Sequence, residues 1–108
     1  MSSGDGSIRV LVADDHPVVR GGLIALLETL DGVRVVGQVG TGREAVGAAL
    51  AQQPDVVVMD LRMPDLDGVA ATRQIRARAP GVAVLVLTMF EEDSWYRRRW
   101  RRVLAGTC

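Results

Sequence analysis

The chain alternates short apolar runs with helix-forming segments, and this alternation is the strongest constraint on its fold. Four runs of four to seven residues consist mainly of Val, Leu, Ile and Ala, as in strands that are buried on both faces. We predict strands at Ile8–Ala13, Val33–Val39, Val56–Met59 and Val82–Leu87. Because parallel strands need helical crossovers between them, the order indicates an α/β fold: a doubly wound parallel sheet with helices on both faces.

Helix signals fall between these runs. Asp15 is placed to cap the first helix, and Thr41 is placed to cap the second, which is rich in alanine. The pattern predicts helices from near Pro17 to Asp31–Gly32, from Thr41 to Gln53 and from about Val69 to Arg78, with a fourth starting in FEEDS (90–94). Asp65 and Asp67, in the loop before the third helix, are interpreted as solvated carboxylates.

Three of the predicted strands end in polar residues: the first at Asp14 and Asp15, the third at Asp60 and the fourth at Thr88. If these strands are neighbours, their carboxyl ends meet at one edge, where ligands bind in such sheets. Carboxylates held together repel one another, so Mg²⁺ is the natural counter-charge. Magnesium keeps coordination positions for a phosphoryl oxygen, and the Thr88 hydroxyl could donate to such an oxygen. The cluster therefore favours phosphoryl chemistry, in which a carboxylate can be the nucleophile.

Three segments, VLVADDHPVVRGGL, VVVMDLRMPDLDGVAATRQIR and VLVLTMFEED, resemble response-regulator receiver domains of the NarL/FixJ type. The resemblance spans about residues 8–93 and implies a flavodoxin-like sheet of five strands. It implies that Asp60 accepts a phosphoryl group from a sensor histidine kinase, with Thr88 as the switch hydroxyl. The metal ligands implied for Mg²⁺ are Asp14, Asp15, Asp60 and the backbone carbonyl of Arg62. The chain would then be a signalling protein, able to form a homodimer, and not an enzyme.

The sequence departs from this family after its fourth strand. No fifth strand or last helix is recognisable, and the chain has no lysine to match the family's conserved ammonium group. We therefore divide it into a flexible N-terminus (1–7), a partial receiver domain (8–93) and an aberrant arginine-rich tail (94–108). No DNA-binding domain is recognisable, so a role in transcription regulation is implied by the family alone. The alternative function is a truncated, non-signalling fragment that binds a kinase or an intact regulator, or a gene remnant.

Composition adds bounds to these predictions. The length of 108 residues suits one domain, and 13 basic residues balance 13 acidic ones, which favours neither a nucleic-acid coat nor a membrane surface. Cys108 has no partner for a disulfide, and no signal peptide or membrane span is apparent, so we expect a cytoplasmic protein. His16 more simply begins a helix than binds metal or phosphate. The tail could be a nucleic-acid patch or a disordered segment.

We predict instead that the tail from about Ser94 is translated in a shifted frame. Its arginine and tryptophan content changes abruptly, and back-translation of residues 95–108 with GC-rich codons gives PAAVAAGARGYL in another frame. That string resembles the family's approach to its fifth strand. Resequencing the locus checks this prediction. We expect the bases after codon 93 to encode, in another frame, a GARGYL-like string followed by a lysine. If no other frame encodes such a string, the frameshift is disproved.

Overall fold

The computed structural model describes residues 6–63 and 65–87. These residues form a parallel sheet with the strand order β2-β1-β3-β4, which confirms the predicted doubly wound α/β fold. Along the chain the elements are β1 (Ile8–Ala13), α1 (Pro17–Leu27), β2 (Val33–Val39), α2 (Gly42–Gln52), β3 (Val56–Asp60), α3 (Gly68–Arg78) and β4 (Ala83–Leu87). The fourth helix and the tail predicted from the sequence lie outside the described residues.

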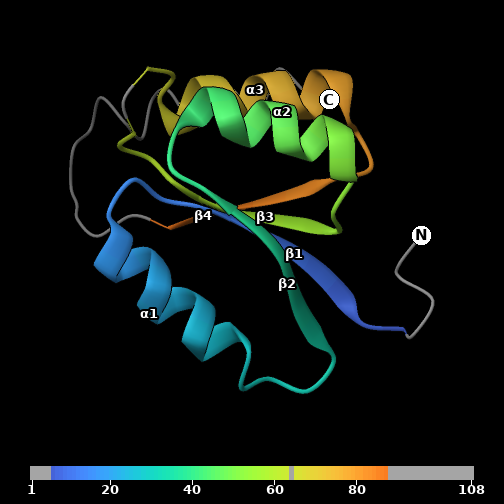
Figure 1. The fold of residues 1–108 in the computed structure, drawn as a ribbon. Helices are drawn as coiled ribbons and strands as arrows, with labels where there is room; N and C mark the ends of the chain where they lie inside the picture. Colours follow the sequence, from blue (N-terminus) through green and yellow to red (C-terminus); the bar gives the residue numbers. More distant parts are fainter. Residues whose placement is uncertain (1–5, 64, 88–108) are drawn as a thin grey trace.

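The helices cover the two faces of the sheet unequally (Figure 1). Helices α2 and α3 lie side by side on one face, and α1 lies alone on the other. The chain places β2 on one side of β1, then crosses back to place β3 and β4 on the other side. A switch point therefore lies between β1 and β3, and sheets of this kind bind ligands beyond the strand ends at such a point.

Most element boundaries agree with the sequence prediction, with two corrections at α1. The helix ends at Leu27 with Glu28 as its C-cap, earlier than the predicted Asp31–Gly32; Gly32, at φ +82°, instead makes the turn into β2. The N-cap is His16 and not Asp15, and no side chain caps this end. Asp15 was the wrong choice because its carboxylate contacts the His16 ring.

The predicted cap of α2 is confirmed. The Thr41 hydroxyl accepts a hydrogen bond from the Glu44 amide at 3.1 Å, and the Glu44 carboxylate accepts one from the Gly40 amide at 3.1 Å. The first bond satisfies an amide that the first helical turn leaves without a partner, and the second ties the residue before the cap to the helix. They fix the point at which the chain leaves β2 and enters α2.

The core lies mainly between the sheet and the α2/α3 layer. Its buried side chains come from β1, β3, α2, α3 and the segments beside them: Leu11, Ala13, Ala45, Val46, Ala49, Val57, Met59, Met63, Ala71, Ile75, Ala79 and Val82. The opposite face has a smaller buried cluster of Val10, Val12 and Val58. Helix α1 contributes partly buried residues to it but no fully buried one.

Substituting Leu11 by alanine should therefore be costly. The Leu11 side chain is fully buried in the larger cluster, so Leu11→Ala leaves a cavity and should lower the free energy of unfolding by about 2–4 kcal/mol. Leu26→Ala is the matched control, because Leu26 is 61% exposed on α1 and its loss should change stability by less than about 0.5 kcal/mol. Urea unfolding of both variants measures the difference; equal effects would contradict this description of the core.

Candidate functional site

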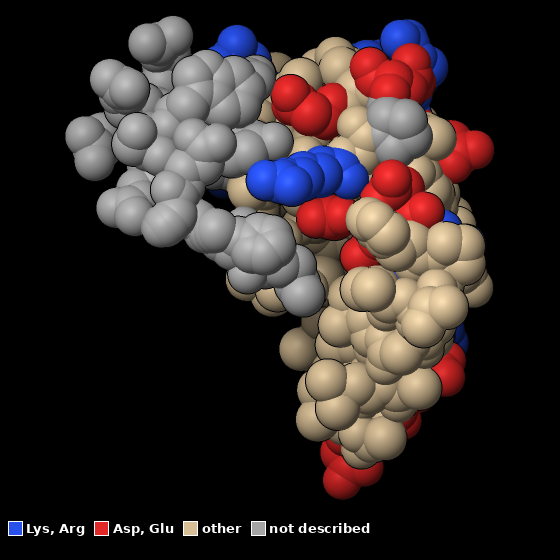
Figure 2. Space-filling view, turned by 90° about the vertical axis from the view of Figure 1, so that its left-hand side faces the viewer, with Lys and Arg blue, Asp and Glu red and all other residues tan. Residues whose placement is uncertain are grey.

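Three carboxylates and one imidazole meet at the carboxyl edge of the sheet. Asp14 and Asp15 follow β1, and Asp60 ends β3, which pairs directly with β1. One ligand atom from each of Asp14, Asp15, His16 and Asp60 lies within 4.8 Å of the others. Figure 2 faces this edge and shows Asp and Glu side chains gathered beside an arginine. The edge thus concentrates negative charge at the topological switch point.

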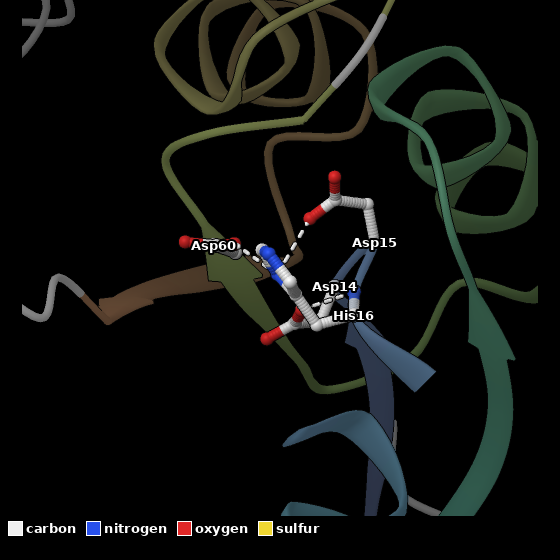
Figure 3. Close-up of side chains that lie close together, drawn as sticks. All are labelled: Asp14, Asp15, His16 and Asp60. Carbon is white, nitrogen blue, oxygen red and sulfur yellow. Dashed lines mark hydrogen bonds and ion pairs between the residues drawn. The ribbon is translucent and has the colours of Figure 1, made fainter. Parts of the chain in front are cut away.

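His16 lies among the carboxylates (Figure 3). Its Nδ1 is 2.9 Å from Asp15 Oδ1, 3.3 Å from Asp14 Oδ1 and 4.0 Å from Asp60 Oδ2. Its backbone amide also donates to Asp14 Oδ1 at 2.8 Å. His16 is the helix start that the sequence predicts, and it is also part of this cluster. Its position directly after two aspartates was the available signal.

An arginine on α1 holds the end of β1 from outside the cluster. The Arg20 guanidinium donates from Nη1 to the Asp14 carbonyl at 2.8 Å and from Nε to Gln38 Oε1 at 2.9 Å. It therefore links α1, the β1 end and β2. Arg20 could not be predicted from the sequence, because no motif shows that an arginine four positions after a histidine returns to the preceding strand.

The surroundings disfavour the charged form of Asp60. Burial raises the pKa of the Asp60 carboxyl above its ordinary value of 3.8, and repulsion from Asp14 and then from Asp15 raises it further. A hydrogen bond from the Arg62 amide, 3.4 Å from Asp60 Oδ1, and the nearby His16 act in the opposite direction. The net effect is a raised pKa, so a nearby positive charge would stabilise the ionised Asp60 carboxylate.

These residues fit a divalent cation. Asp15 Oδ1 is shielded from solvent; within the described part of the chain it has the ion-pair contact with His16 Nδ1 at 2.9 Å but accepts no hydrogen bond, so it has a lone pair available for a cation. Oxygen ligands from three carboxylates are the set that Mg²⁺ prefers. Arg62, whose carbonyl is the fourth predicted ligand, follows Asp60 by two residues and is exposed, between the buried Leu61 and Met63. Thr88 lies outside the described residues; β4 ends at Leu87, the register partner of Asp60.

The loop after Asp60 is closely packed against the strand. The Gly68 amide donates to the Leu61 carbonyl at 2.9 Å, and a Cβ atom at Gly68 would overlap the carbonyl oxygen of Asp60. Asp67 caps α3 by accepting from the Ala70 amide at 2.8 Å. Asp67 is therefore not a solvated loop carboxylate, contrary to the sequence-based interpretation.

Comparison with known proteins decides the family. The family model for the response regulator receiver domain matches residues 10–101. The chain belongs to the response-regulator receiver family. This membership confirms the resemblance identified from the sequence motifs.

The relatives and solved structures agree with this assignment. The chain is 42% identical over 99 residues to the response regulator GacA of Pseudomonas viridiflava, covering 92% of this chain and 46% of GacA. It is 46% identical over 87 residues to VraR of Staphylococcus aureus strain Mu3, covering 81% and 42%. The signal receiver domain of Mycobacterium tuberculosis NarL superposes with a TM-score of 0.82 at 31% identity, covering 89% and 77%. The chain thus spans less than half the length of GacA and of VraR.

Removing the Asp60 charge should stabilise the metal-free protein. The folded state raises the pKa of the Asp60 carboxyl, so it favours the protonated form of this group. The protonated carboxyl is therefore compatible with the fold below about pH 3.8, and the fold loses stability as the pH rises through the folded pKa and the group becomes charged. In buffer that contains a metal chelator at pH 7, Asp60→Asn should therefore have a higher melting temperature than the wild type. The difference in melting temperature should shrink as the pH falls toward 3.8. Asp31→Asn, at an exposed aspartate, is the control. A lower melting temperature for Asp60→Asn at pH 7 would contradict the assigned repulsion.

Proposed function

We propose that this receiver accepts a phosphoryl group on Asp60 from a sensor histidine kinase. The observation that carries the proposal is the placement of Asp60: it ends a central strand beside Asp14 and Asp15, and its side chain remains 17% exposed. A donor can therefore reach the carboxylate, while the two neighbouring acids can hold the cation that offsets added negative charge. Membership of the receiver family supports the same assignment.

The transfer can be written in terms of Asp60 alone. A carboxylate oxygen of Asp60 forms a bond to phosphorus as the bond between phosphorus and the kinase's histidine nitrogen breaks, and the electron pair stays on that nitrogen. The product is an acyl phosphate on Asp60. The acyl phosphate carries more negative charge than the carboxylate that it replaces, so the transfer increases the repulsion from Asp14 and Asp15 and depends on a bound cation to offset it.

The other site residues bind and orient. Asp14, Asp15, Asp60 and the Arg62 carbonyl would hold Mg²⁺, which supplies charge neutralisation at the phosphoryl oxygens when bound. Arg20 fixes the Asp14 backbone, and the His16 amide fixes the Asp14 carboxylate. Thr88 is proposed as the hydroxyl that donates to the phosphoryl group.

The wider role follows from the family. We propose that the receiver acts in the cytoplasm as a signalling acceptor, not as an enzyme, and that its output is transcription regulation, with homodimer formation as a further family property. The relatives carry more than twice the matched length, so these outputs depend on the whole protein. Among the described residues, the helices are too short or too polar to cross a bilayer.

Phosphorylation can be tested on the intact chain. With Mg²⁺ and a small acyl phosphate donor, we expect mass spectrometry to show the addition of one phosphoryl group to the wild type and none to Asp60→Asn. Asp55→Asn, at the opposite end of β3, is the control and should still be modified; its side chain keeps an acceptor for the Arg9 amide. A wild type that folds but gains no phosphoryl mass would favour the non-signalling fragment, which binds a kinase or regulator without this chemistry.

A further inference from the structure

The loop between β3 and α3, described for residues 61–63 and 65–67, is anchored to the body of the protein at residues 61 and 63. Leu61 accepts the Gly68 amide, and the Leu61 and Met63 side chains are buried at 4% and 8% exposure. Arg62 lies between these two buried residues, and its backbone amide donates to Asp60. These anchors restrict the part of the loop that carries the proposed carbonyl ligand.

A third contact joins the far part of the loop to the first turn of α2. Gly42 begins this helix, and a Cβ atom there would overlap the carbonyl oxygen and carbon of Leu66. The backbones of α2 and the loop therefore approach more closely than any other residue type at position 42 would allow. The loop is seated against α2, although α2 carries none of the proposed site residues.

Arg43, the next residue of α2, binds Asp65 of the loop directly. Arg43 donates from Nε to Asp65 Oδ2 at 2.8 Å and from Nη2 to Asp65 Oδ1 at 3.2 Å, a two-bond pairing of guanidinium and carboxylate. Asp65 has φ +74°, in the left-handed region that is costly for residues other than glycine. The pairing thus holds a strained residue in place; Asp65 is solvent-exposed, as the sequence predicted, but its carboxylate is also paired with Arg43.

We propose that Arg43 is a positioning residue for the metal site. Through Asp65, it fixes the loop so that the Arg62 carbonyl stays within reach of the acidic cluster. This inference rests on the proposed phospho-acceptor function, because it concerns the Mg²⁺ that serves the same site. The start of α2 would then have a role beyond packing, because residues that hold a metal ligand in place without binding the metal influence the affinity of the site for the metal.

The sign of the effect separates positioning from simple electrostatics. Removing the positive charge of Arg43 should strengthen binding of a cation nearby if charge alone matters. Loss of positioning should weaken it. The pairing is also exposed, with 74% of the Arg43 side chain accessible, so its removal should change the stability of the metal-free fold little.

The experiment measures Mg²⁺ affinity from the rise of the melting temperature of the full chain with Mg²⁺ concentration. For Arg43→Gln we expect about tenfold weaker binding, at the lower end of the range for outer-shell residues. Arg43→Lys keeps the charge but loses the two-bond geometry, so it should also bind more weakly than the wild type. Arg73→Gln, at an exposed arginine of α3, is the matched control and should bind as the wild type does.

Unchanged or tighter Mg²⁺ binding by Arg43→Gln would overturn the inference, as would a wild type whose melting temperature does not respond to Mg²⁺. The proposed function is judged separately by phosphoryl mass on Asp60. A wild type that binds Mg²⁺ but takes no phosphoryl group would refute that function, while the comparison of Arg43 variants would still decide the positioning role.

Discussion

The rest of the structure depends on the cost of holding three carboxylates together at a partly buried strand edge. Asp60 loses solvent and is repelled by Asp14 and Asp15, and both effects oppose its ionisation. The protein offsets this cost only in part, with the His16 amide and ring and with the Arg62 amide. The cluster therefore has the composition and the close spacing that suit a divalent cation.

The sequence was sufficient for the elements that depend on local physics. Strands β1 to β4 follow from β-branched runs, and the Thr41 cap follows from a hydroxyl three residues before Glu44. The convergence of Asp14, Asp15 and Asp60 follows once β1 and β3 are neighbours. Strand order does not follow from these local patterns and is implied only by the family resemblance, because it is set by packing between distant segments.

What the sequence could not supply were contacts between residues far apart in the chain. The Arg20 bond to Asp14 and the Arg43 pairing with Asp65 depend on how α1 and α2 approach the strand ends. Local patterns also failed where two uses of one side chain compete. Asp15 could have capped α1, but its carboxylate faces the acidic cluster, and His16 became the N-cap without a side-chain bond.

The packing of Gly68 against Asp60 also limits how this site can change over generations. Every other amino acid has a Cβ atom, and that atom would meet the peptide carbonyl of the proposed nucleophile. Every nonsynonymous change in the codon for residue 68 must therefore shift the Asp60 backbone or the start of α3. Silent changes alone leave the geometry intact, so this glycine position should show almost no standing variation wherever selection maintains the site.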